Sequence, residues 1–140
     1  MLIKNELDKI GLTAGNAVLI GSGILDALGI RKSKDIDVTV NEDTYRILSA
    51  DGRFKKANNH GREVLVDGLY EIGTSWGVLG KNQQFNDLFK QSIVIDSVRY
   101  ITLEFLLAVK RSWLTDTDVR QKDIDDIRLI EDYPQCRTGK

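Results

Sequence analysis

Cysteine and histidine are scarce in this chain of 140 residues. The one cysteine, Cys136, excludes an intramolecular disulfide and a zinc cluster built from thiolates. The one histidine, His60, follows two asparagines and precedes a glycine, so it is predicted to be a loop residue. A nucleophile paired with histidine would depend on that single residue, and the sequence favours a site built from other side chains.

A long apolar run and an excess of either charge are also lacking. No segment approaches the roughly 18 apolar residues of a membrane span, and residues 1–10 are charged and amphipathic, unlike a signal peptide. Together with the single cysteine, this predicts a cytoplasmic protein without membrane contact. The 20 basic and 21 acidic residues give a net charge of −1, which offers no electrostatic surface for long nucleic acid. Length and a hydrophobic content of 41% predict one soluble domain over 1–140.

The most informative pattern is a glycine turn followed by two acids. A short apolar strand ends at Gly21 and Ser22, a helix follows, and a second strand then presents Asp35 and Asp37. Strand side chains alternate between faces, so the two acids share one face while their apolar neighbours point into a core. Adjacent carboxylates repel each other unless a cation lies between them, and hard oxygen ligands suit Mg²⁺. The backbone N–H groups of the glycine turn and the start of the helix can hold phosphates.

Neither motif alone indicates a functional site. An Asp-x-Asp motif most often lies on a solvated edge strand, and a Gly-Ser-Gly sequence usually forms only a turn. Their order resembles the nucleotidyltransferase superfamily that includes DNA polymerase beta, and most closely its minimal bacterial and phage members. Those include antibiotic nucleotidyltransferases and the toxins of abortive-infection systems. The resemblance implies an α+β fold, with a mixed β-sheet, helices packed mainly on one face and the carboxylate face left open.

The resemblance also implies a third carboxylate on a neighbouring strand. Glu71 stands in an apolar-acid-apolar triplet that fits this position. Asp67 and Gly68 separate two alternating segments, which predicts a hairpin. Asp67 is therefore interpreted as a turn residue and Glu71 as the third acid. The structural alternative for Glu71 is an exposed strand position that pairs with a lysine or an arginine.

A second region of resemblance lies near the C-terminus. A helix with Lys110 near its end precedes 120–127, with the sequence Arg-Gln-Lys-Asp-Ile-Asp-Asp-Ile, and small nucleotidyltransferases carry a similar pair. Lys110 ends an apolar stripe, from which it either reaches a cleft or only complements the helix dipole. The isoleucines of the last helix predict its buried stripe and leave Asp123 and Asp126 on a solvated face. The alternative places Lys122 and Asp123 on the back wall of the cleft.

The pattern along the chain also predicts the elements of secondary structure. Helices are expected over 3–10, 24–29, 42–50, 84–90, 103–113 and 119–132. Strands are expected over 17–20, 36–40, 92–95 and 98–101 and in a hairpin over 62–72. The segment 73–82 is expected to be a loop, in which Trp76 either stacks on a substrate base or anchors the loop on the core.

The function implied by the resemblance is Mg²⁺-dependent transfer of a nucleoside monophosphate from an NTP to an acceptor hydroxyl, with release of pyrophosphate. The expected metal ligands and catalytic residues are Asp35, Asp37 and Glu71. The expected nucleotide-binding residues are Gly21, Ser22 and Lys110. Glu71 would complete the acceptor-side metal or act as general base, and Lys110 would offset charge on the leaving pyrophosphate.

Two departures from the family pattern keep other functions open. Lys34 stands where many relatives have a small or hydroxyl residue, and its charge would weaken metal binding. No separate acceptor-binding domain is expected, so a dimer or a partner subunit would complete the site. The alternatives are a non-catalytic nucleotide-binding or protein-interaction module of antitoxin type, and an enzyme that adds nucleotides to tRNA ends. The second would need a basic groove that the near-neutral composition does not indicate.

Overall fold

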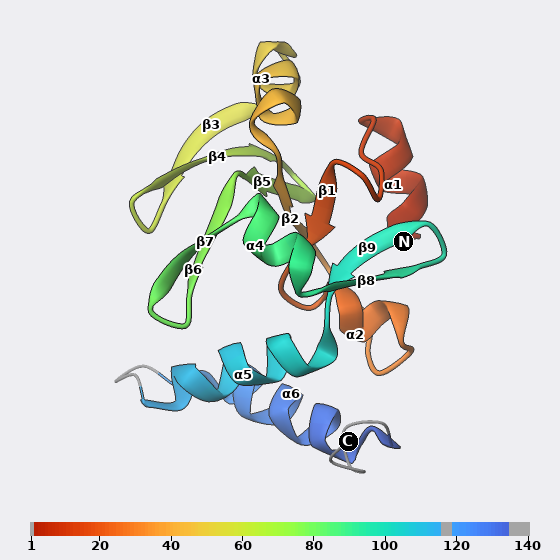
Figure 1. Cartoon of the computed structure of the whole chain (residues 1–140), viewed down its shortest axis with the longest axis vertical. Helices are drawn as coiled ribbons and strands as arrows, with labels where there is room; N and C mark the ends of the chain where they lie inside the picture. Colours follow the sequence, from red (N-terminus) through yellow and green to blue (C-terminus); the bar gives the residue numbers. More distant parts are fainter. Residues whose placement is uncertain (1, 116–118, 135–140) are drawn as a thin grey trace.

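The structure of the chain is a computed structural model that describes residues 2–115 and 119–134. The prediction made for Cys136 falls outside these residues. The architecture is α+β, with helices around a mixed sheet, as the sequence predicts (Figure 1). The helices are α1 (Ile3–Lys9), α2 (Gly23–Ala27), α3 (Glu42–Ala50), α4 (Phe85–Lys90), α5 (Leu103–Ser112) and α6 (Gln121–Asp132). No helix in this described part is long and apolar enough to cross a membrane.

Seven of the nine strands in the described residues form one sheet in the order β3-β4-β5-β2-β1-β9-β8. The strands are β1 (Ala17–Leu19), β2 (Ile36–Val40), β3 (Lys55–Asn59), β4 (Arg62–Asp67), β5 (Tyr70–Gly73), β6 (Ser75–Val78), β7 (Lys81–Gln84), β8 (Ser92–Ile95) and β9 (Val98–Ile101). Central β2 pairs antiparallel with β1 and parallel with β5. The end of β1 therefore meets the starts of β2 and β5 at one end of the sheet, where Gly21, Ser22, Asp35, Asp37 and Glu71 lie.

One face of the sheet is apolar and packs against the first three helices. The Tyr70 hydroxyl donates to the Glu6 carbonyl of α1 at 2.8 Å. On α3, the Tyr45 hydroxyl donates to Glu63 Oε2 at 2.7 Å. The first residue of α2 packs directly on Leu19. Three helices thus cover this face, which confirms the prediction that helices pack mainly on one side.

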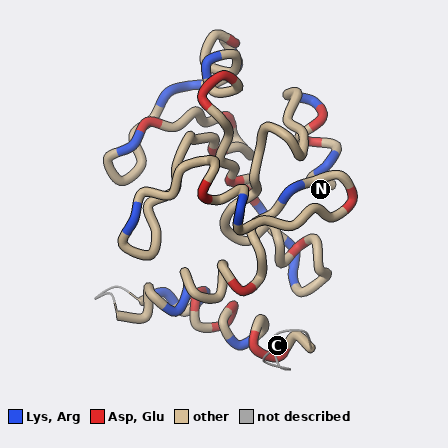
Figure 2. The backbone as a smooth tube through the Cα atoms, viewed as in Figure 1, with Lys and Arg blue, Asp and Glu red and all other residues tan. Residues whose placement is uncertain are grey.

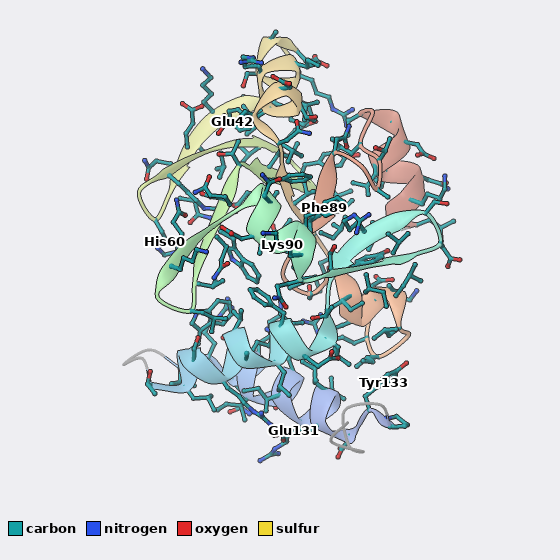
Figure 3. All side chains as sticks on the ribbon, in the orientation of Figure 1. Glu42, His60, Phe89, Lys90, Glu131 and Tyr133 are labelled. Carbon is teal, nitrogen blue, oxygen red and sulfur yellow. The ribbon has the colours of Figure 1, made fainter. Side chains whose placement is uncertain are left out.

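The opposite face carries Asp37 and Glu71. Alternation from the register places Arg99 on the same face, and its guanidinium lies 3.7 Å from the ring centroid of Phe89 on α4. Figure 3 shows Phe89 in the part of α4 that crosses in front of the sheet. Helix α4 contacts β1, so it covers the β1 and β9 side of this face rather than β4 and β5.

Helices α5 and α6 lie side by side beyond the edge of the sheet, next to α2 (Figure 1). Thr102 caps the start of helix α5, because its Oγ1 accepts the Phe105 N–H at 3.2 Å. The Trp76 ring of β6 lies 6.4 Å from the Phe105 ring of α5. The partly buried Trp76 packs against the core, as its structural alternative predicts.

One expected loop is wrong, and one strand was missed. The segment 73–82 contains the β6–β7 hairpin, and β3 was not predicted at all. Strand β3 is an edge strand made of polar, almost wholly exposed residues, so it lacks the apolar alternation that reveals a strand. The β6–β7 turn places Leu79 at φ 57, a conformation that leucine rarely adopts. His60, at φ 52, occupies the β3–β4 turn as predicted (Figure 3).

The predicted hairpin at 62–72 exists, but its turn is shifted by one residue. Strand β4 continues through Asp67, which pairs with Tyr70, and the turn consists of Gly68 and Leu69. Gly68 has φ 53, so it supplies the left-handed residue that this two-residue turn requires. The Asp67 carboxylate instead accepts a hydrogen bond from Arg53 Nε at 2.6 Å.

Candidate active site

The glycine turn lies directly against Asp37. The Ile20 N–H donates to the Asp37 carbonyl at 2.9 Å, which fixes the end of β1 beside β2. Gly21 has φ 65, and a Cβ atom there would lie 3.3 Å from Asp37 Oδ2. Glycine is therefore required both by the backbone conformation and by the neighbouring carboxylate. Within the described chain, the N–H groups of Gly21 and Ser22 donate to no backbone carbonyl.

Asp37 and Glu71 stand opposite each other on the parallel strands β2 and β5. Two residues hold the Glu71 carboxylate: Asn59 Nδ2 donates to Oε2 at 2.8 Å, and Arg62 Nη2 lies 3.6 Å from the same oxygen. Arg62 also donates to the Ser75 carbonyl on β6. Both interpretations of Glu71 describe part of the structure, because it lies beside Asp37 and it pairs with an arginine. Sequence reasoning missed Asn59 and Arg62, which stand opposite each other on the unpredicted β3–β4 pair.

The carboxylates perturb one another. Burial, followed by the charges of Glu71 and Asp35, raises the pKa of Asp37 to about 6. The nearby charges of Arg62 and Lys122 lower this pKa and offset part of the rise. Burial and the two neighbouring carboxylates thus both disfavour the ionised form of Asp37, and a cation bound beside it would favour that form.

The donor set fits Mg²⁺, because carboxylate oxygens are the hard ligands that this ion prefers. Asp35 is exposed at the start of β2, and Asp37 and Glu71 lie on neighbouring strands. In the ranges that the structure describes, however, no three acidic, histidine or cysteine side chains converge closely enough to hold a metal as they stand. At least one of the three carboxylates would have to move to complete such a set.

Lys110 belongs to a different, buried cluster. Its side chain is 5% exposed, and Nζ lies 2.9 Å from Asp123 Oδ1 and 3.0 Å from Asp126 Oδ2. Arg31 Nε donates to Asp126 Oδ1 at 2.6 Å, and its Nη2 donates to Oδ2 at 2.7 Å. Burial raises the pKa of Asp126, but hydrogen bonds from Arg31 and Lys110 outweigh it and hold the pKa below its ordinary value.

The buried cluster corrects the prediction that Asp123 and Asp126 lie on a solvated face, since they are 3% and 1% exposed. Their charges are tolerated because cations from α5 and from the loop before β2 satisfy them. Figure 2 shows basic and acidic residues interleaved along α5 and α6. The exposed Lys122 lies beside this cluster in sequence, and its charge lowers the pKa of Asp37 slightly.

The Ser22 hydroxyl is hydrogen-bonded to another side chain of the protein. Its Oγ lies 3.0 Å from the Oγ of Ser33, a buried residue in the loop between α2 and β2. A shallow pocket lies at the opposite end of β2 and includes none of the predicted site residues; it is lined by Val40, Asn41, Glu42, Thr74, Gln84, Phe85 and Asn86. The candidate site is therefore the open carboxylate edge rather than this pocket.

Comparison with solved structures gives the fold. A solution structure of the antibiotic-resistance factor ANT(2'')-Ia aligns with TM-score 0.53 and 20% identity, over 92% of this chain and 78% of that chain. A crystal structure of ANT(2'')-Ia in complex with adenylyl-2''-tobramycin gives the same score and identity over 92% and 83%. No family model and no curated protein matches the sequence. The chain has the nucleotidyltransferase fold, which confirms the fold implied by the sequence.

Proposed function

We propose that this protein is a Mg²⁺-dependent nucleotidyltransferase that moves a nucleoside monophosphate from an NTP to an acceptor hydroxyl and releases pyrophosphate. The observation that carries the proposal is the crowding of Asp37 by Glu71 and Asp35 beside a glycine turn, in a chain of nucleotidyltransferase fold. In support, the similarly folded ANT(2'')-Ia forms a complex with a nucleotidylated compound, adenylyl-2''-tobramycin.

Asp35, Asp37 and Glu71 would be the metal ligands. Mg²⁺, when bound, would neutralise charge on the triphosphate and on the leaving pyrophosphate. The proximity of Glu71 to Asp37 also suits it to accept the proton of the acceptor hydroxyl, as a general base. Asn59 and Arg62 would keep Glu71 in place until the ligands arrive.

The triphosphate would be bound by the N–H groups of Gly21 and Ser22, which have no backbone acceptor in the described residues. Lys122 is a better candidate than Lys110 to offset charge on pyrophosphate. It is exposed and acts on Asp37, whereas the Lys110 ammonium is buried between two carboxylates of α6. Binding of phosphate by Lys110 would require both of its ion pairs to break.

A labelled-NTP experiment tests this function. The protein is incubated with each NTP, Mg²⁺ and a cell extract, and the molecule that takes up label is identified. Asp35→Asn and Asp37→Asn should abolish labelling without loss of the fold, since each removes a metal ligand while relieving repulsion. Near-normal labelling by either variant would reject the assignment.

One observation favours a non-catalytic binding module as the second candidate. One oxygen of the Glu71 carboxylate, Oε2, already has Asn59 and Arg62 as partners. Such a module would bind Mg²⁺ and an NTP, seen as a rise in melting temperature, without releasing pyrophosphate. Pyrophosphate release that depends on Glu71 would exclude this candidate.

A further inference from the structure

A chain of hydrogen bonds joins the glycine turn to the start of β2. Ser33 Oγ lies 2.9 Å from the Asp35 carbonyl oxygen and 3.0 Å from Ser22 Oγ. The Ser33 N–H donates to Asp26 Oδ2 at 2.8 Å, and the residue is 7% exposed. Ser33 therefore contacts three separate parts of the site's support: the turn, helix α2 and the strand of the metal ligands.

The direction of these bonds follows from the number of protons. A carbonyl oxygen can only accept, so the single hydroxyl proton of Ser33 goes to the Asp35 carbonyl. The short contact between the two serines must then be made with the proton of Ser22. Ser22 Oγ consequently presents only lone pairs to any other group, and it cannot donate to an anionic phosphate while this chain is intact.

We propose that Ser33 is a positioning residue of the candidate active site, which holds the Gly21–Ser22 turn against the start of β2 and takes the hydroxyl proton of Ser22. It follows that Ser22 contributes to phosphate binding through its N–H and not through its hydroxyl. The nucleotide part of this inference rests on the proposed function, whereas the hydrogen-bond chain exists in the protein without ligand.

The surrounding loop supports a positioning role. Two residues before Ser33, the Arg31 guanidinium bonds both oxygens of the buried Asp126 on α6. The loop from 31 to 35 is thus fixed to α6 at one end and to the glycine turn at its middle. Loss of the Ser33 hydroxyl would remove the bonds of this loop to the glycine turn and to the Asp35 carbonyl, while its attachments to α6 and to Asp26 remain.

A cycle of variants in the ligand-free protein tests the hydrogen-bond chain. Ser22→Ala and Ser33→Ala should each lower the melting temperature, by roughly 2–5 °C. The double variant should have the same melting temperature as Ser33→Ala, because in Ser33→Ala the Ser22 hydroxyl has already lost its partner. Ser112→Ala is the matched control, since that hydroxyl donates to a carbonyl within α5. If the melting temperature of the double variant falls by the sum of the two single effects, the proposed chain of hydrogen bonds is wrong.

Binding of Mn²⁺ together with a non-hydrolysable NTP tests the positioning role. Ser22→Ala and Ser33→Ala should weaken binding by a similar factor, roughly fivefold. The double variant should bind no more weakly than the single variants. Ser22→Thr, which keeps a hydroxyl, should bind like the wild type, and Ser112→Ala should leave binding unchanged. A loss of affinity in Ser22→Ala alone would mean that Ser22 donates to phosphate and would overturn the proposal, as would unchanged binding in both single variants.

These experiments also separate this proposal from the proposed function. If the wild-type protein binds neither Mn²⁺ nor the nucleotide, the proposed function fails. The melting cycle then decides the hydrogen-bond chain by itself, because it uses no ligand.

Discussion

Replacement of Asp37 by asparagine should stabilise the ligand-free protein at neutral and alkaline pH. Burial and the charges of Glu71 and Asp35 raise the pKa of Asp37 from 3.8 to about 6. The folded state therefore opposes ionisation of this carboxyl, whereas the unfolded chain does not. Asparagine keeps the shape of the side chain and removes the charge that the fold disfavours.

The size of the effect follows from the pKa. Each pKa unit corresponds to about 1.4 kcal/mol, so ionisation of Asp37 lowers the free energy of unfolding by up to about 3 kcal/mol. Contact with solvent reduces this value, because Asp37 is only partly buried. A gain of about 2 to 3 kcal/mol would raise the melting temperature by roughly 5–10 °C in a chain of this length.

The stabilisation expected from Asp37→Asn depends on pH. A carboxyl with a raised pKa contributes its full stability below pH 3.8, where it is protonated in both states, and loses it as pH rises through about 6. Asp37→Asn should thus have the same free energy of unfolding as the wild type near about pH 3. The variant should then become progressively more stable than the wild type as pH rises through this window. Above this pH window, the difference in stability between the variant and the wild type should be constant.

Thermal and urea unfolding across this pH range measure the effect. Asp67→Asn is a suitable control, because Asp67 lies on the adjacent hairpin and pairs with Arg53, so its loss should lower stability slightly. Added Mg²⁺ should raise the melting temperature of the wild type above pH 6 and do little for Asp37→Asn. A loss of stability in Asp37→Asn that is the same at all pH values would refute the idea that Asp37 is crowded.

Three further changes test other contacts. Lys110→Met removes the buried cation that Asp123 and Asp126 share, which leaves them with Arg120 and Arg31 as partners, and should cost about 3–5 kcal/mol in urea unfolding, whereas the exposed Arg111→Met should cost little; equal costs would contradict the buried cluster. Gly73→Ala places a Cβ atom 2.6 Å from the Arg62 guanidinium, so the melting temperature should fall, and an unchanged value would show that this arginine moves freely. Glu71→Gln should lower the rate of transfer on the order of 10²-fold, measured as pyrophosphate release, with NTP affinity within a few fold; full activity would remove Glu71 from catalysis.

Elements with a clear apolar pattern or a helix cap could be predicted from the sequence. Strand β2, helix α3 and strands β8 and β9 begin and end at the predicted residues. The start of α3 follows from Asn41, whose Oδ1 accepts the Thr44 N–H at 2.8 Å. In contrast, β3 and the β6–β7 hairpin are polar, and their pairing depends on turns that the sequence specifies weakly. Leu79 at positive φ is one such turn residue.

The candidate site could be predicted only in part, for the same reason. Apolar residues on both sides of Asp37 and of Glu71 identify two strand acids, and the register then places them opposite each other. The residues that hold Glu71 could not be found, because Asn59 and Arg62 come together through the β3–β4 pairing. The proton donated by Ser22 could not be inferred either, since it requires the positions of Ser33 and of the Asp35 carbonyl.

Helix α6 shows why helical period alone does not locate buried charges. Asp123, Asp126, Ile127 and Ile130 lie at i, i+3, i+4 and i+7, so the acids share the buried stripe with the apolar residues. A rule that assigns charges to solvent fails here, because their partners lie 13 residues away at Lys110 and 95 residues away in the loop before β2. An unpaired buried carboxylate costs several kcal/mol, so these acids become plausible core residues only once both cations are located. The sequence did contain one sign of this arrangement: Lys110 ends an apolar stripe, and a cation that is buried there requires an acid on the helix that packs against it.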